Sequence, residues 1–160
     1  MTKLVQYKNN SIQLQLWDTA GTERYNSMGA SFYRNSELCV LVFDLTIEES
    51  FKNVDTWRAE FLNILNPPEG EKFPFVLIGN KCDMKSEIKI SEEQIKAYCE
   101  KYNNMAYFSA SAKEGINLDE AFNKVAELAF ERYTIGEENL VPEVKYIKID
   151  KKEELKKRCC

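Results

Sequence analysis

Apolar residues recur at every second position near the start of the chain. Ile12, Leu14 and Leu16 alternate with polar glutamines. A period of two is typical of a β-strand that has one face covered. Residues 4–7 have the composition of a partner strand, and the Asn9-Asn10 pair between the two segments predicts the turn of a β-hairpin.

Three later stretches are apolar without interruption. Residues 38–43 lead directly into Asp44, residues 73–79 lead into Asn80, and residues 105–109 form a shorter run. A continuous apolar run of this length predicts a strand that is buried on both faces, as in a parallel sheet covered by helices. We therefore expect residues 38–43 and 73–79 to be fully buried strands, with a third, shorter strand after them.

Helical spacing of apolar residues fills the segments between these runs. Residues 50–65 show it clearly, and the proline-containing sequence of residues 66–70 ends the predicted helix. Ser91 and Gln94 have the spacing of a capping box, which predicts a second helix that reaches about Tyr102.

A last helix is predicted to begin after Asn117, which with Glu120 has the pattern of an amino-terminal cap. One face of this helix is apolar, and its members are Leu118, Ala121, Phe122, Val125 and Ala129. The pattern lapses after Thr134 into a polar, proline-containing segment. Strands that alternate with helices in this way predict an α/β fold: a doubly wound, mainly parallel sheet with helices on both faces.

Composition excludes several classes of site. The chain has no histidine, and its five cysteines include no Cys-x-x-Cys pair, so neither a zinc site nor a secreted disulfide framework is expected. No stretch approaches the roughly 20 apolar residues of a membrane-spanning helix. The net charge is −4, yet residues 145–160 contain seven basic and three acidic residues. A basic tail on an acidic body indicates contact with an anionic surface, and nothing in the pattern indicates nucleic-acid binding.

The sequence Asn80-Lys81-Cys82-Asp83 stands at the carboxyl end of a predicted strand, where α/β sheets bind their ligands. A carboxylate can accept hydrogen bonds from two adjacent N–H groups, and an amide can both donate and accept. Guanine offers adjacent N–H donors on its ring edge, and adenine does not. The alternative is a polar surface loop, and this short motif alone does not exclude it.

Two further loops follow predicted strands. In Asp18-Thr19-Ala20-Gly21 the carboxylate could hold Mg²⁺ through water, and the glycine would let its backbone approach a phosphate. An ordinary turn is the alternative there. In Ser111-Ala112-Lys113 the small residues would let the backbone reach a planar base, although that signal is weak by itself.

The order and spacing of these three loops resemble the Ras superfamily of small GTP-binding proteins. Residues 17–25, 32–34 and 41–44 resemble the Rab family within it, and residues 50–52, 57–61 and 73–75 resemble its late-endosomal branch. The resemblance implies a fold of the small-GTPase type. It also implies a nucleotide-dependent switch in vesicle-mediated membrane traffic, with GTP, GDP and Mg²⁺ as cofactors.

The resemblance implies a role for each residue of the base-binding loops. Asp83 would accept hydrogen bonds from the guanine edge, Asn80 would brace the base and the neighbouring loops, and the stem of Lys81 would lie along the base and sugar. Ala112 would offer its backbone N–H to the guanine oxygen. The remaining residues of that loop, which would shape it, are Ser111 and Lys113.

Other implied roles concern the phosphates and the partners. Asp18 would hold the water shell of Mg²⁺, and Gly21 would sense the third phosphate. Residues 21–34 would form a switch that the triphosphate orders and hydrolysis releases. Trp17 and Phe32 match two of the three aromatic residues that Rab proteins present to effectors. The implied partners are effector proteins, an exchange factor, a prenylation escort protein and a GDP-dissociation inhibitor.

The sequence departs from the family in containing no Gly-x-x-x-x-Gly-Lys-Ser/Thr motif. In the family that phosphate loop, its strand and the first switch precede the segment that begins at Thr2. We therefore expect an amino-terminally truncated, incomplete domain over residues 1–133, through an incomplete gene model or a truncated product. The central strand would be missing between residues 11–17 and 38–44, which would leave exposed strand edges.

The absence of that motif would weaken nucleotide binding. Hydrogen bonds to charged groups contribute roughly 1.5–3 kcal/mol each, so the loss of three phosphate contacts costs on the order of 5–9 kcal/mol. That is at least ~10³-fold in affinity. Thr22 is a second departure, because the family usually has glutamine there, whose amide orients the attacking water. We therefore expect slow GTP hydrolysis.

Residues 134–160 are expected to form a flexible tail, which ends in Lys-Lys-Arg followed by Cys159 and Cys160. In the Rab family a terminal Cys-Cys pair is doubly geranylgeranylated, and two lipid chains anchor stably where one does not. Basic residues add about 1 kcal/mol each near an anionic leaflet. The resemblance thus implies the cytoplasmic face of an endomembrane, late endosome, lysosome or vacuole, with a cytosolic pool. The alternative is a frayed charged end with incidental cysteines.

Two other interpretations of the whole chain stay open. It could be a non-enzymatic module with an effector surface around Trp17 and Phe32, a lipid tail and no nucleotide cycle. It could also be a fragment that does not fold.

Overall fold

The structure, a computed structural model, describes residues 1–19, 33–68 and 72–140. The elements in chain order are β1 (Thr2–Tyr7), β2 (Asn10–Gln15), β3 (Cys39–Asp44), α2 (Glu48–Leu65), β4 (Phe75–Asn80), the short 3₁₀ helix η1 (Lys85–Glu87), α3 (Glu92–Lys101), β5 (Ala106–Ser109) and α4 (Leu118–Leu140).

Three strands form a parallel sheet in the order β3-β4-β5. The register places Asp44 beside Asn80 and Gly79 beside Ser109. All three strands therefore end at the same edge of the sheet, and the loops that follow them meet there. This is the edge at which an open α/β sheet binds its ligands.

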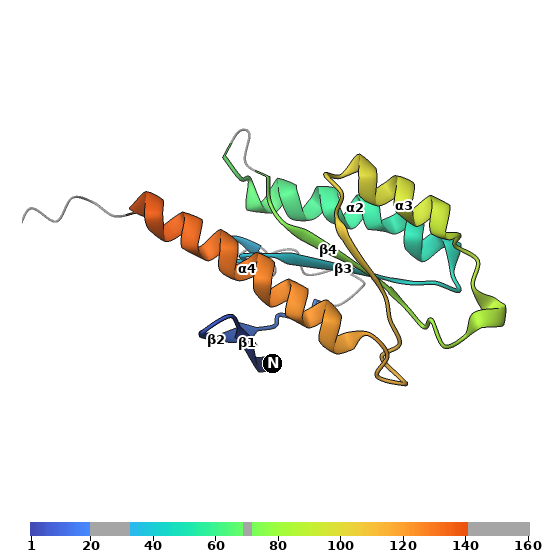
Figure 1. Ribbon diagram of the computed structural model, residues 1–160. Helices are drawn as coiled ribbons and strands as arrows, with labels where there is room; N and C mark the ends of the chain where they lie inside the picture. The colour runs from blue at the N-terminus through green and yellow to red at the C-terminus, as the bar shows by residue number, and fades with distance from the viewer. Residues whose placement is uncertain (20–32, 69–71, 141–160) are drawn as a thin grey trace, which may run out of the picture.

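Helices cover both faces of this sheet. Helices α2 and α3 lie on one face and α4 on the other (Figure 1). The side chains of β4 alternate between two cores: Phe75 and Leu77 pack with residues of α2 and α3, whereas Val76 and Ile78 pack with residues of α4. The predicted α/β fold, with a parallel sheet wound on both faces, is confirmed.

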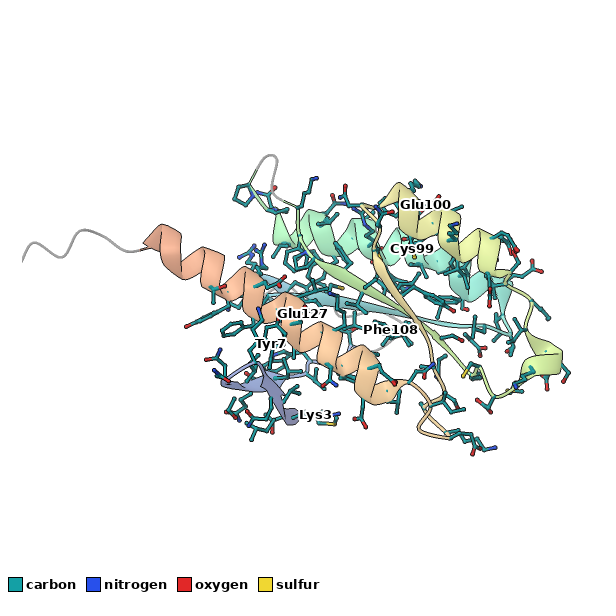
Figure 2. The ribbon with its side chains drawn as sticks, viewed as in Figure 1. Lys3, Tyr7, Cys99, Glu100, Phe108 and Glu127 are labelled. Carbon is teal, nitrogen blue, oxygen red and sulfur yellow. The ribbon has the colours of Figure 1, made fainter. Side chains whose placement is uncertain are left out.

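Strands β1 and β2 form the predicted antiparallel hairpin, which packs against α4. Figure 2 shows Tyr7 on the hairpin facing Glu127 of the helix, and the Tyr7 hydroxyl donates a hydrogen bond to that carboxylate at 3.2 Å. Val5 and Leu14 complete the core beneath α4. The turn differs by one residue from the prediction, because Lys8 takes the left-handed conformation (φ 52°) and Asn10 already pairs with Tyr7.

The hairpin and the parallel sheet are two separate sheets in the described part of the chain. No described strand pairs with the outer edge of β3. This agrees with the expectation that a strand is missing between residues 11–17 and 38–44. The prediction that residues 38–43 are fully buried is wrong, since the Val42 side chain is 59% exposed. Alternate residues of β3, such as Leu41 and Phe43, are buried against α2. Val42 points to the opposite face, where Leu38 and Val40 pack with the core beneath α4, but its own side chain is largely exposed.

The predicted helix boundaries are mostly confirmed. Helix α2 ends at Leu65 and is capped by Asn66, which takes the left-handed conformation. Helix α3 begins with a complete capping box between Ser91 and Gln94. Helix α4 extends beyond the predicted Thr134 to Leu140. The sequence between Thr134 and Leu140 contains no proline, so its polar character does not by itself end the helix. None of the described helices is long and apolar enough to span a membrane.

Candidate functional site

Backbone hydrogen bonds tie the loop after β4 to the loop after β5. The Ala110 N–H donates to the Gly79 carbonyl at 2.8 Å, and the Cys82 N–H donates to the Ala110 carbonyl at 3.0 Å. The Asn80 side chain completes the connection, because its Oδ1 accepts a hydrogen bond from the Ala112 N–H at 3.0 Å. The two predicted base-binding loops are thus one hydrogen-bonded unit at the carboxyl edge of the sheet.

Ser111 holds the second loop in a closed shape. Its side chain is fully buried, and its backbone exchanges two hydrogen bonds of 3.1 Å with Ile116. The Ser111 hydroxyl accepts a hydrogen bond from the Glu114 N–H at 3.1 Å, and Gly115 supplies the left-handed turn (φ 73°). Ala112 and Lys113 are exposed at the tip of this loop, where a ligand can reach them.

Asp83 is held as an ionised carboxylate. A hydrogen bond from the Ser111 hydroxyl, with help from the nearby ammonium groups of Lys113 and Lys81, keeps the pKa of Asp83 below its ordinary value of 3.8. Its Oδ1 atom is shielded from solvent and has no hydrogen-bond partner among the described residues. An ionised carboxylate can accept several hydrogen bonds. The Asp83 side chain therefore has acceptor capacity that the described residues leave unused.

Lys81 is anchored by a residue that the sequence analysis did not assign to the site. The Lys81 Nζ lies 2.6 Å from the Asp44 Oδ2, and the Asp44 side chain is only 15% exposed. The other Asp44 oxygen accepts hydrogen bonds from the N–H and the hydroxyl of Thr46, at 2.8 and 2.7 Å. Asp44 stands at the end of an apolar strand, as Asn80 does. This shared position is the signal in the sequence that could have assigned Asp44 to the site.

The protonation of this pair follows from its contacts. Burial alone would raise the pKa of Asp44, but the hydrogen bonds from Lys81 and Thr46 outweigh burial and keep that pKa below 3.8. The hydrogen bond to Asp44 raises the pKa of Lys81 above its ordinary 10.5. Both groups are therefore charged at neutral pH, and the ammonium is fixed above the end of β3.

We expect the Lys81–Asp44 ion pair to make the stability of the fold decrease at acidic pH. A carboxylate whose pKa is depressed in the folded state stabilises the fold above its unfolded pKa, and that contribution is lost as the pH falls through the folded value. Urea unfolding at pH 7 and at about pH 3 should therefore show a smaller acid loss for Asp44→Asn than for the parent. Asp119→Asn, at an exposed ion pair with Lys3, is the control; an equal acid loss in all three proteins would contradict the prediction.

Of the two phosphate-side residues, the structure describes Asp18. It follows β2, in the hairpin sheet, and is exposed. Trp17 is 54% exposed. No group of three or more metal-ligating side chains forms among the residues described. The other predicted site residues, Gly21, Thr22, Phe32, Cys159 and Cys160, lie outside the described residues.

Comparison with known families agrees with this geometry. Residues 1–131 match the sequence model of the Ras family. The chain belongs to the Ras family. Its relatives include Rab7 of Pisum sativum, 47% identical over 129 residues, or 79% of this chain and 63% of that protein. They also include RABG3d of Arabidopsis thaliana, 47% identical over 133 residues, and the Ypt/Rab-type GTPase ypt7 of Schizosaccharomyces pombe, 46% identical over 132 residues.

Within the Ras family, these names confirm the predicted resemblance to the late-endosomal branch of the Rab proteins. The match to RABG3d covers 81% of this chain and 64% of RABG3d. The match to ypt7 covers 82% of this chain and 64% of ypt7. The chain thus spans a little less than two thirds of the length of the curated relatives it matches.

Proposed function

We propose that this Ras-family chain recognises the guanine base of GDP and GTP at residues 80–83 and 111–113. The single observation that carries the proposal is the unpaired, shielded Oδ1 of Asp83, on a carboxylate that Ser111 keeps ionised. Adjacent N–H donors on a guanine edge would pair with this carboxylate, whereas an adenine edge offers no such pair.

The other residues of the two loops would orient the base. Asn80 braces the second loop through the Ala112 N–H, and that same N–H would be shared with the guanine oxygen. Asp44 holds the Lys81 ammonium at 2.6 Å. The apolar stem of Lys81 is therefore fixed beside the site, where it would cover the base and sugar.

On the phosphate side, the proposal assigns Asp18 to the water shell of Mg²⁺ and Gly21 to the third phosphate. A single carboxylate suits this ion, because Mg²⁺ keeps several waters and is bound largely by substrate phosphates. When bound, the ion would neutralise phosphate charge. Thr22 lacks the amide that orients water in the family, so the proposed GTP hydrolysis would be slow.

At the level of the cell, we propose a switch in endosomal or vacuolar membrane traffic, on the basis of the Rab7 and Ypt7 names of the relatives. Prenylation of Cys159 and Cys160, with an escort protein, would attach the chain to the cytoplasmic face of the membrane. A GDP-dissociation inhibitor would keep a cytosolic pool. Effectors would contact the surface that includes Trp17 and Phe32, of which Trp17 is exposed, and an exchange factor would be a further partner.

The test is calorimetric titration of the purified chain with GDP and with ADP, in the presence of Mg²⁺. We expect saturable binding of GDP and at least about tenfold weaker binding of ADP, since one lost hydrogen bond to a charged group is worth about tenfold or more. Equal affinities would contradict guanine recognition. A folded chain that binds neither nucleotide would instead favour the non-enzymatic binding module.

A further inference from the structure

A pocket of about 300 Å³ lies at the opposite edge of the sheet from the base-binding loops. It is formed by the amino-terminal ends of β4 and β5, with contributions from α2, from the segment after α3 and from α4. Three of its lining residues are basic, namely Arg58, Lys72 and Lys124, and none of those in the described part of the chain is acidic. A small pocket with this charge favours an anion.

Arg58 is held rigidly in the wall of this pocket. Its guanidinium carbon lies 3.9 Å from the centre of the Tyr102 ring and 5.2 Å from the centre of the Phe75 ring. Stacking on aromatic rings fixes the plane of a guanidinium group, and its donors with it. The group is therefore pre-organised before any ligand arrives.

The Nε atom of Arg58 is shielded from water and has no hydrogen-bond partner in the described structure. A shielded charged donor without an acceptor is costly, and native structures contain few of them. The described residues also give the Arg58 guanidinium ring contacts but no ion pair, so a bound anion would supply its counter-charge. This missing counter-charge is the second observation, independent of the charge of the lining, that points to a ligand.

Among the described residues, the other charges around the pocket leave a cationic excess. Lys72 is exposed and forms no ion pair with the described residues. Lys124 lies 2.7 Å from Glu127 and so is partly neutralised. The nearby Asp55 is engaged elsewhere, because it accepts hydrogen bonds from the Tyr102 hydroxyl at 2.6 Å and from Lys101 at 3.4 Å.

We propose that this pocket is a binding site for an oxyanion, a phosphate or carboxylate group, held by the Arg58 guanidinium with Lys72 and Lys124 beside it. The planar donor set of arginine matches two oxygens of such a group at once. The site is separate from the proposed guanine site and does not depend on it.

The test follows backbone amide shifts of Tyr102 and Asn104 by NMR during titration with sodium phosphate and with sodium acetate, each against sodium chloride at matched ionic strength. In the parent chain we expect saturable shifts that chloride does not produce. Tighter saturation by phosphate would assign a phosphate group, and tighter saturation by acetate a carboxylate. Shifts with either anion that only match those with chloride would overturn the proposal.

Variants identify the residues that bind. We expect Arg58→Lys, which keeps the charge but loses the planar donor pair, to weaken binding about tenfold. Lys72→Gln should weaken binding about threefold, because it removes one of the cations beside the anion. Since this charge is exposed, its loss should have little effect on folding. Lys52→Gln, also on α2 and exposed, is the matched control and should bind as the parent does. If Lys72→Gln and Lys52→Gln bind alike, the proposal is overturned even if Arg58→Lys does not fold.

Discussion

Replacement of Gly79 by alanine is expected to destabilise the fold by about 1–3 kcal/mol, the usual cost of overpacking a core. A Cβ atom at this position would lie 2.8 Å from the Tyr107 hydroxyl oxygen and 3.0 Å from a methyl carbon of Leu45. Leu45 is only 2% exposed, so neither it nor the Tyr107 ring can move without disturbing the packing around them. Because proteins of this size are stable by only about 5–15 kcal/mol, this is a large effect.

The same substitution would also reach the candidate site. The Gly79 carbonyl accepts the hydrogen bond that positions Ala110, and Asn80 is the next residue. Urea unfolding should show a lower midpoint with an unchanged slope. The control is Gly115→Asn, because an added Cβ there has open space and asparagine tolerates a positive φ. A Gly79→Ala protein as stable as the parent would contradict this account of the packing.

Replacement of Asp83 by asparagine is expected to weaken GDP binding by at least about tenfold and to remove the preference for GDP over ADP. The carboxylate of Asp83 presents an acceptor to the base, whereas the amide of asparagine would present an N–H donor. This donor would face an N–H group of guanine, and no hydrogen bond could form between them. The fold should remain intact, because an asparagine oxygen can still accept the hydrogen bond from the Ser111 hydroxyl that Asp83 accepts. Side-chain size is also conserved.

The measurement is calorimetric titration with both nucleotides, with urea unfolding as a check on the fold. Asp119→Asn is the matched control, since that carboxylate is 91% exposed on α4 and its ion pair is with Lys3, outside the two loops. If Asp83→Asn keeps the parent's preference for GDP, Asp83 is not the residue that reads the base.

Local patterns were sufficient to predict most of the fold. The period-two spacing of Ile12 and Leu14 predicted the hairpin, and the Ser91 and Gln94 capping box predicted the start of α3. Both features depend on residues close together in the chain. The parallel register could not be predicted in detail, but the expectation that strand ends share one edge was sufficient to place Asn80 beside the loop of Ser111 and Ala112.

What the sequence could not predict depends on contacts between distant segments. The pairing of Lys81 with Asp44 requires the β3–β4 register, which brings Asp44 beside Asn80. The exposure of Val42 depends on what covers one face of β3, which the apolar run alone does not reveal. The unpaired Nε of Arg58 depends on how α2 packs against Tyr102. Each of these is a tertiary contact, whereas periodicity reports only local structure.

The central claim, that the loops at residues 80–83 and 111–113 form one guanine site, is tested most directly by a nucleotide titration read residue by residue. NMR spectra of the ¹⁵N-labelled chain would be recorded during addition of GDP and, separately, of ADP. We predict saturable shifts at the backbone amides of Asn80, Asp83 and Ala112 with GDP, and none of that size with ADP. Equal shifts with both nucleotides, or GDP shifts confined to other parts of the chain, would contradict it.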